Sequence, residues 1–202
     1  MSFTPNRAHV RIKWLISSTS DSWLKQAIDN PIEMLIDHAH CERKAAGAAV
    51  QLMFRYLCEP GLAEALSPLA REELDHFERV LGILKSRGRY LEPLPAPPYG
   101  AALAKQIRTP EPDRMLDSFL VAGLIEARSH ERMSLLARYS QDLELASLYR
   151  ELLDSEARHF CLYWKLAEER FERKLIASRL KELAEAEAEI LSELHPEPRM
   201  HS

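Results

Sequence analysis

Glycine and cysteine are scarce in this sequence, and their scarcity excludes several classes of protein. Only 6 of the 202 residues are glycine, and no long run alternates apolar with polar side chains. Both features favour helices over strands. The three cysteines, Cys41, Cys58 and Cys161, are an odd number without paired spacing. We therefore expect an all-α protein with reduced thiols, located in the cytoplasm, and not a disulfide-rich one.

Long hydrophobic runs, nucleotide-binding motifs and an excess of positive charge are also missing. The apolar run IKWLI near the N-terminus is too short for a signal peptide or a membrane span, so we expect no membrane partner. No G-x-G-x-x-G, P-loop or C-x-x-C motif is present, which leaves nucleotide-cofactor and zinc-ribbon sites without support. Because the net charge is −4, a nucleic-acid partner would need a local basic patch.

Helical periodicity and capping residues predict a single domain, residues 1–202, with four long helices. We expect the long helices at 31–57, 67–87, 112–139 and 142–169, short helices near 20–30 and 101–107, an additional helix at 172–194, an irregular arm at 1–20 and a tail at 195–202. Ser67 as the N-cap and Pro68 at the first helical position set the start of the second long helix. The proline-rich stretch YLEPLPAPPYG, residues 90–100, is expected to be non-helical.

The lengths of the connections predict how the four long helices are arranged. The first two and the last two are joined by short connections, so each pair should form an antiparallel hairpin. A longer connection, of about 24 residues, separates the second helix from the third. Two hairpins joined by one long crossover predict the ferritin-like form of the four-helix bundle, with additional short and C-terminal helices.

A carboxylate interrupts the apolar stripe of each long helix near its middle, and two of the four helices add a histidine one turn later. The six residues are Glu42, Glu73, His76, Glu126, Glu156 and His159. An ionised group in a dry core must be paired, neutralised or bound to metal. Two divalent cations would balance the charge of four carboxylates. One Glu from each of two helices and one Glu-x-x-His from each of the others is the di-iron or di-manganese pattern.

The spacing of these residues supports a paired site. Glu42 and Glu73 are 31 residues apart, and Glu126 and Glu156 are 30 apart, as expected for two similar hairpins. A single Glu-x-x-His pair is more often a solvated face or a core histidine, but four matched stripes favour a metal site. Carboxylates with histidine suit iron or manganese better than copper or zinc. Such a site can store or oxidise iron, dismutate peroxide or activate O₂, and spacing does not choose among these.

Several neighbouring residues are assigned to ordinary structural roles. We expect His38 and His130 to be core or rim histidines, although either could support or join the ligands. The tyrosines Tyr56, Tyr149 and Tyr163 are expected in the core, and Glu72 and Glu131 are expected to be solvated. An acidic run on a surface helix is expected at Glu185, Glu187 and Glu189.

Four segments that contain the six residues closely resemble the MiaE family. They are MLIDHAHCERKAAGAAV, LAREELDHFERVLGILKSRG, LIEARSHERMSLLA and LDSEARHFCLYWKLA, and the resemblance covers roughly residues 20–170. Members of that family are bacterial tRNA hydroxylases that act on 2-methylthio-N(6)-isopentenyladenosine beside the anticodon. The resemblance implies a ferritin-like fold, a centre of two iron ions held by the same six residues, and O₂-dependent hydroxylation of the isopentenyl group.

The implied monooxygenase reaction consumes two electrons from outside the enzyme. Because the chain has no flavin or nicotinamide motif, a separate reductase or ferredoxin is implied as the electron donor. Two other classes stay open: a rubrerythrin- or ferritin-like protein that handles iron or peroxide, and a helical adaptor with a vestigial site. A tRNA partner would need a basic rim, and two clusters are candidates: Lys85, Arg87 and Arg89 after the second long helix, and Arg7, Arg11 and Lys13 in the arm. Both clusters could equally be solvated surface charge.

Overall fold

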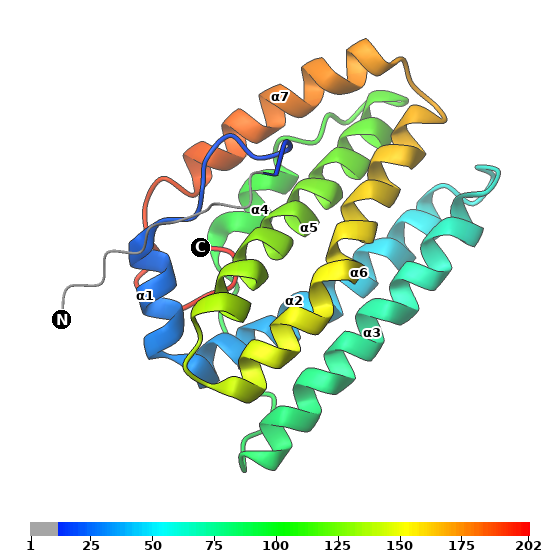
Figure 1. The fold of residues 1–202 in the computed structure, drawn as a ribbon. Helices are drawn as coiled ribbons and strands as arrows, with labels where there is room; N and C mark the ends of the chain where they lie inside the picture. Colours follow the sequence, from blue (N-terminus) through cyan, green and yellow to red (C-terminus); the bar gives the residue numbers. More distant parts are fainter. Residues whose placement is uncertain (1–11) are drawn as a thin grey trace.

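The computed structural model describes residues 12–202, and within that range all regular structure is helical (Figure 1). The helices are α1 (Asp21–Asp29), α2 (Pro31–Arg55), α3 (Leu62–Ser86), α4 (Pro98–Ala104), α5 (Asp113–Tyr139), α6 (Leu143–Glu168) and α7 (Arg173–Ile190). None of these helices is both long enough and apolar enough to cross a membrane. Cys41, Cys58 and Cys161 are all free thiols.

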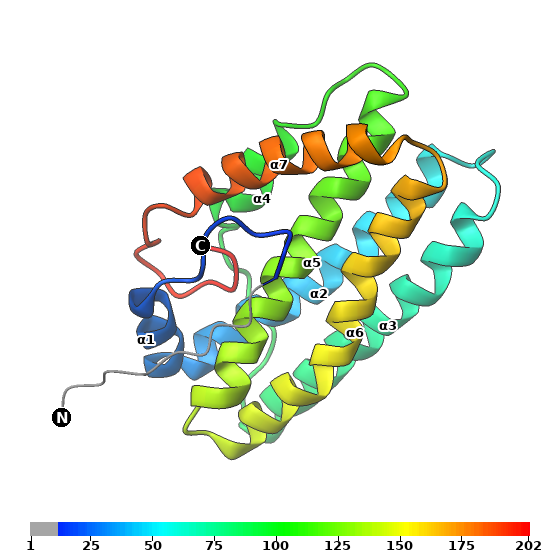
Figure 2. The same cartoon turned by 45° about the horizontal axis from the view of Figure 1, so that its top comes forward.

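Four long helices, α2, α3, α5 and α6, form the bundle that the sequence predicts. α2 packs on α3 and α5 packs on α6, each pair as an antiparallel hairpin (Figures 1 and 2). The connection from α3 to α5 runs the length of the bundle and carries α4. The all-α, ferritin-like bundle with one long crossover and additional helices is therefore confirmed.

The second bundle helix begins earlier than the sequence predicts. α3 starts at Leu62, after Gly61 with φ of +74°, so Ser67 is not its N-cap and Pro68 lies inside the helix. An interior proline costs about 3 kcal/mol or more. Full burial of Leu62 and Leu66 contributes about 1.5–3 kcal/mol each, which offsets that cost. Apolar burial therefore overrides the local signal of the Ser-Pro pair.

Two other helix boundaries also differ from expectation. α4 begins at Pro98, inside the proline-rich stretch that was expected to be non-helical. A proline is compatible with the first turn of a helix, and the turns that follow bury Tyr99 and Leu103. α7 ends at Ile190, four residues before the predicted end at 194.

The last helix packs across α5 and contributes a buried ion pair (Figure 2). Arg128 donates from Nε and Nη2 to Glu187, at 2.8 Å each, and from Nη1 to Glu131 at 2.6 Å. Glu131 also accepts hydrogen bonds from the backbone and the hydroxyl of Thr19. The expectation that Glu131 is solvated is therefore wrong, and so is the placement of Glu187 in a surface run, because α5 is covered on its outer side as well. Glu185 is exposed, as predicted.

We expect Glu187→Ala to destabilise the protein by about 3–5 kcal/mol, because it leaves the Arg128 guanidinium buried without its main partner. Glu185→Ala, two residues away on the exposed side of α7, is the matched control and should change stability by less than about 0.5 kcal/mol. Urea denaturation of both variants measures the difference. Equal stability of the two would show that the ion pair is dispensable.

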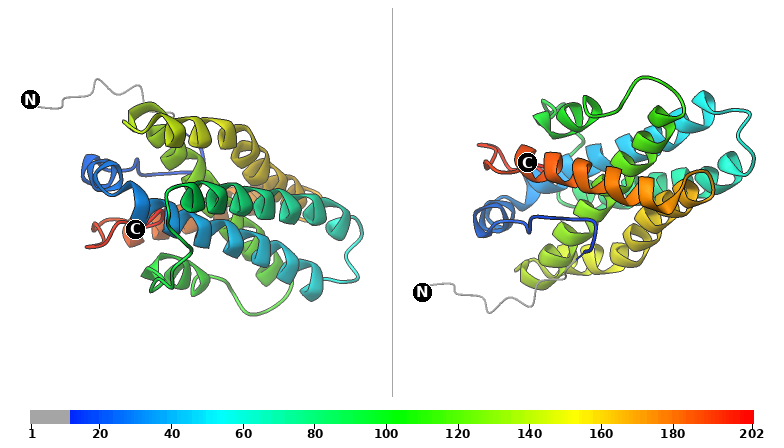
Figure 3. Two further views of the ribbon diagram at one scale, coloured as in Figure 1. Left: turned by 90° about the horizontal axis from the view of Figure 1, so that it is seen from below. Right: turned by 90° about the horizontal axis from the view of Figure 1, so that it is seen from above.

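The C-terminal segment was expected to be a tail but is packed between α2 and α5, close to α1 (Figures 1 and 3). The backbone N–H of Met200 donates to Asp37 at 2.7 Å, and Arg132 donates to the carbonyl oxygens of Met200 and Ser202. The His201 ring stacks on Tyr99 with 5.1 Å between centroids. Met200 has no exposed surface. This segment therefore closes the seam between the two hairpins at one end of the bundle.

Candidate metal centre

The six residues selected from the sequence converge in the middle of the bundle. Glu42 comes from α2, Glu73 and His76 from α3, Glu126 from α5, and Glu156 and His159 from α6. None is more than 5% exposed. Each sits where the apolar stripe of its helix faces the interior, so packing of the four stripes brings all six together.

The ligand atoms form two adjoining groups. Glu42, Glu73, His76 and Glu156 place one potential ligand atom each within 4.8 Å of one another, and so do Glu73, Glu126, Glu156 and His159. Glu73 and Glu156 belong to both groups. Each group therefore has its own glutamate and its own histidine, and the two groups share two carboxylates between them.

His76 is oriented by a serine on the facing helix. Its Nε2 lies 3.1 Å from the Ser155 hydroxyl, whose proton goes to the Leu152 carbonyl at 2.8 Å. The Ser155 oxygen is thus the acceptor for the Nε2–H of His76. Nδ1 faces the cluster, at 3.4 Å from Glu42 and 3.7 Å from Glu73. A hydrogen bond to the outer ring nitrogen is the usual device that presents the other nitrogen to a metal.

His159 is oriented in the same way by Glu72. Its Nε2–H donates to the Glu72 carboxylate at 2.9 Å, and its Nδ1 lies 2.7 Å from Glu73. Glu72 was expected to be merely solvated. Its side chain is 42% exposed and also pairs with Arg158, but the bond to His159 gives it a place beside the centre. The signal for this role was its position next to Glu73, on the side of α3 that faces α6.

Three buried atoms in the cluster have no hydrogen-bond partner among residues 12–202. They are Nδ1 of His76, Nδ1 of His159 and Oε1 of Glu73. The short approach of His159 to Glu73 does not have the alignment of a hydrogen bond. Because buried polar atoms are nearly always satisfied, unpaired nitrogen and oxygen atoms that converge in this way fit bound cations. The donor set of four carboxylates and two imidazoles fits two iron or manganese ions.

Without cations the cluster opposes its own ionisation. Burial, with repulsion from neighbouring glutamates, raises the pKa of Glu126 to about 8 and also raises those of Glu73 and Glu156. Burial would lower the pKa values of His76 and His159, but the adjacent carboxylates outweigh it and raise both to about 9.

One carboxylate of the cluster behaves differently. Burial opposes ionisation of Glu42, but His38 and the other hydrogen-bond partners outweigh it and hold its pKa well below the usual range. The His38 Nε2 lies within hydrogen-bonding distance of Glu42, and its ring packs 5.5 Å from that of Tyr149. His38 is therefore a partner of a candidate ligand and a core residue at the same time.

We expect the metal-free protein to lose stability as the pH rises from about 5 to about 9. The folded-state pKa values of Glu126, His76 and His159 are raised. Their contribution to folding stability is therefore complete below their unfolded-state pKa values and is lost as the pH rises through their folded-state pKa values. Glu42, with a lowered pKa, acts oppositely but only below its ordinary value. Thermal melts in a chelating buffer across this range measure the trend. A melting temperature that increases toward pH 8 would contradict a buried cluster.

The remaining residues singled out from the sequence lie around the centre. His130 is half-buried, and its ring packs against Phe160 with 6.0 Å between centroids. Its Nδ1 has no hydrogen-bond partner within the described part of the chain. Tyr149 and Tyr163 are buried, and Tyr56 is buried with its hydroxyl donating to Glu111 at 3.0 Å. Burial, with repulsion from Glu126 and Glu73, raises the pKa of Tyr163.

Two of the three cations in the first basic cluster, Arg87 and Arg89, form ion pairs with carboxylates. Arg87 donates two hydrogen bonds to Asp142, at 2.6 and 3.1 Å, and a third to Glu144. Arg89 pairs with Glu92 at 3.0 Å, whereas Lys85 is exposed. In the second cluster Lys13 is exposed, and Arg7 and Arg11 lie outside the described residues.

A groove lies between α2 and α5, the two helices that each carry one of the single glutamates of the centre. It has a volume of about 430 Å³, and its walls include Ala48 and Arg55 of α2 and Arg114, Ala122 and Ile125 of α5. Ile125 is adjacent in sequence to Glu126, and Ala48 follows Glu42 by six residues, or about 9 Å of helix. The groove therefore lies along the two helices that carry Glu42 and Glu126, although neither carboxylate is among the described residues that line it.

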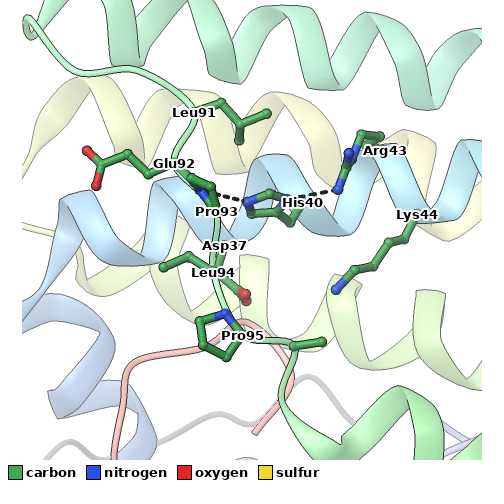
Figure 4. Close-up of a pocket in the computed structure, with 10 residues that line it drawn as sticks. Asp37, His40, Arg43, Lys44, Leu91, Glu92, Pro93, Leu94 and Pro95 are labelled. Carbon is green, nitrogen blue, oxygen red and sulfur yellow. Dashed lines mark hydrogen bonds between the residues drawn. The ribbon is translucent and has the colours of Figure 1, made fainter.

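A second hollow, of about 380 Å³, lies between α2 and the crossover and has a structural explanation (Figure 4). His40 donates to the Glu92 carbonyl at 2.8 Å and accepts from Arg43 at 3.1 Å. Asp37 accepts from the backbone of Met200. These polar groups fasten the crossover and the C-terminal segment to α2.

An all-α bundle whose centre holds two carboxylate–histidine groups with two shared glutamates has the architecture of dinuclear carboxylate proteins. The chain belongs to the MiaE family, since the family model described as tRNA-(MS[2]IO[6]A)-hydroxylase (MiaE) matches residues 6–202. This membership confirms the family expected from the sequence, and with it an enzyme of the oxidoreductase class.

Three relatives illustrate the range of the similarity. The chain is 40% identical over 184 residues to the tRNA 2-(methylsulfanyl)-N(6)-isopentenyladenosine(37) hydroxylase of Pseudomonas putida, which covers 91% of this chain and 89% of the relative. It is 28% identical over 240 residues to the enzyme of the same name from Salmonella typhimurium, covering 95% and 88%. A solved structure from Synechococcus, described as protein 43 with aldehyde deformylating oxygenase activity, is 68% identical with a TM-score of 0.93, covering 95% and 96%.

Proposed function

We propose that this protein is an O₂-dependent di-iron monooxygenase that hydroxylates the isopentenyl group of 2-methylthio-N(6)-isopentenyladenosine in tRNA. The observation that carries the proposal is the pair of adjoining carboxylate–histidine groups, in a chain of the MiaE family with relatives named for this reaction. An external reductase or ferredoxin would provide the two electrons that the reaction consumes, and the cytoplasm, where tRNA is found, is the expected location.

The side chains divide the task of holding two metal ions. Glu42 and His76 would hold one iron, Glu126 and His159 the other, and the two shared glutamates both. Iron bound there would supply the reduction of O₂ and the oxidation of a C–H bond. The chain supplies the rest: Ser155 fixes the ring of His76, and the buried surroundings exclude water from the reacting groups.

The groove between α2 and α5 suits a substrate with an apolar end and a charged frame. Leu52, Val121 and Ile125 give it apolar walls, which fit an isopentenyl group. Arg55 and Arg114 line the same groove and can contact phosphates. A modified base that is turned out of the anticodon loop could then enter while its flanking phosphates stay at the arginines.

A second candidate activity comes from the Synechococcus relative. At 68% identity, its described aldehyde deformylating oxygenase activity is a direct alternative for this chain. The apolar walls of the groove beside the candidate centre could also receive the alkyl chain of an aldehyde. A neutral aldehyde makes no use of Arg55 and Arg114, so the role of these arginines separates the two substrates.

The deciding experiment compares both substrates under one set of conditions. Iron-loaded protein, reductant and O₂ are incubated either with tRNA that carries the modified adenosine or with a long-chain aldehyde. A nucleoside that gains one oxygen atom supports the hydroxylase, and loss of the formyl carbon from the aldehyde alone supports the alternative. Iron binding without turnover of either substrate would leave an iron- or peroxide-handling protein, and absence of iron binding would leave an adaptor.

We expect the double variant Arg55→Ala, Arg114→Ala to bind modified tRNA more weakly, with a salt dependence shallower by about 1 to 2 in the slope of log K against log salt. The comparison variant replaces Lys85, Arg87 and Arg89 with alanine. It should have a smaller effect, because Arg87 and Arg89 already pair with carboxylates. Filter binding at several salt concentrations measures both. If the triple variant weakened tRNA binding more than the double variant, the tRNA docking site would be assigned to the end of α3 instead.

A further inference from the structure

A third hollow lies on the side of α5 away from the groove between α2 and α5. It has a volume of about 620 Å³ and is lined by residues of the segment before α1, of α6 and of α7. Figure 2 shows the course of these three parts of the chain. The residues that matter here are Lys13, Trp14, Trp164, Arg173 and Lys181, and we refer to it as the tryptophan hollow. Two aromatic rings and three cations thus share one concave surface.

The tryptophan hollow is locally positive in a protein whose net charge is −4. No carboxylate is among the described residues that line it. Arg173 lies 2.7 Å from Glu168 and Lys181 lies 3.8 Å from Glu185, but both cations are at least 74% exposed. Exposed pairs of this kind are weak in water, so the cations stay available to an acidic partner.

Trp14 connects this surface to the metal centre. Its ring lies 5.7 Å from that of Trp164, and it fills the space that a Cβ on Gly123 would need. Gly123 is one turn before Glu126 on α5. The Tyr163 Cβ is 3.3 Å from the same position, and the Tyr163 side chain is buried. Close packing therefore extends from the surface through Trp14 to Gly123 and Tyr163, one turn from Glu126 on α5, which is too tight for a substrate but close enough for electron transfer.

We infer that the tryptophan hollow is the docking surface for the electron donor, a small acidic iron–sulfur protein of the [2Fe–2S] ferredoxin class. This inference rests on the proposed function. The reaction R–H + O₂ + 2 e⁻ + 2 H⁺ → R–OH + H₂O needs two electrons, so a one-electron donor is oxidised in two successive encounters. Positive charge around an apolar centre suits such brief, electrostatically steered contacts.

The position of the hollow allows donor and substrate to bind at the same time. The substrate groove faces α2 through Ala122 and Ile125 of α5, whereas the tryptophan hollow adjoins Gly123 on another side of that helix. An RNA strand is the other polyanion that a positive aromatic surface could hold. The donor is favoured because packed Trp14 closes the way from the hollow to the centre for a base, whereas electron transfer needs only the packed contact.

The test measures binding of an oxidised [2Fe–2S] ferredoxin to the metal-free protein by calorimetry, so that it does not depend on activity. Arg173→Glu with Lys181→Glu should weaken binding at least tenfold, and wild-type affinity should fall as salt is added. Lys85→Glu with Lys105→Glu is the control with the same change in net charge at exposed positions elsewhere. It should change the affinity less than threefold.

Two outcomes would overturn the inference. One is unchanged ferredoxin affinity in the Arg173→Glu, Lys181→Glu variant. The other is that this variant loses affinity for a tRNA anticodon stem–loop but not for ferredoxin, which would assign the hollow to the substrate. Turnover with dithionite as the electron donor separates the docking surface from the proposed function. This turnover should be unchanged in the variant. Its absence in the wild type would count against the proposed function, while the binding result would still decide the docking surface.

Discussion

Glu126→Ala is expected to lose most of the bound iron and more than about 100-fold of the activity, with unchanged helical content. The Glu126 carboxylate provides a potential ligand atom to one of the two groups. Its removal takes away little packing, so the helices should be kept. Loss of an outer-shell partner alone typically costs 10–100-fold, so loss of a direct ligand should cost at least that much. Iron analysis, circular dichroism and turnover measure the three quantities. Glu42→Ala and His159→Ala should behave in the same way.

The shared glutamates give this prediction a sharper form. Glu73→Ala removes a ligand from both groups and should bind less iron than Glu42→Ala, which affects one group. Glu185→Ala, on the exposed side of α7, is the control and should keep full iron content. Full iron loading in Glu126→Ala would show that α5 provides a different ligand. His130 would then be the first candidate, because Glu131 is held by Arg128 and Thr19.

Removal of the metal is expected to lower the melting temperature by about 8–16 °C at neutral pH. A ligand present at a thousand times its dissociation constant stabilises the folded state by about 4 kcal/mol. For a chain of this length each kcal/mol corresponds to about 2–4 °C. Metal-free and iron-loaded samples compared by calorimetry at pH 7 test the difference. Equal melting temperatures would mean that the convergent carboxylates are not bridged by cations.

The bundle could be predicted because its determinants are local. The stripes that contain Glu42, Glu73, Glu126 and Glu156 repeat with helical period, and a stripe broken by one carboxylate is visible without knowledge of the fold. The short and long connections then limit the topology. Convergence of the four glutamates follows once the stripes face one another.

The residues that were wrongly placed depend on contacts that lie far apart in the sequence. Glu72 takes part in the centre because His159, 87 residues later, needs an acceptor for its outer nitrogen. Glu187 is buried because Arg128, 59 residues earlier, faces α7 and not solvent. Neither partner can be identified from periodicity. The position of Pro68 inside α3 has the same origin, since burial of the leucines before it outweighs a local signal.

The most direct test of the central claim uses isotopically labelled oxygen. Iron-loaded protein is supplied with ¹⁸O₂, an electron donor and tRNA that carries 2-methylthio-N(6)-isopentenyladenosine. The tRNA is then digested, and the masses of the nucleosides are measured by mass spectrometry. We predict one ¹⁸O atom in the isopentenyl group and none when the label is in water, with the product absent in Glu126→Ala. An unmodified nucleoside after full iron loading, or oxygen that comes from water, would contradict the account.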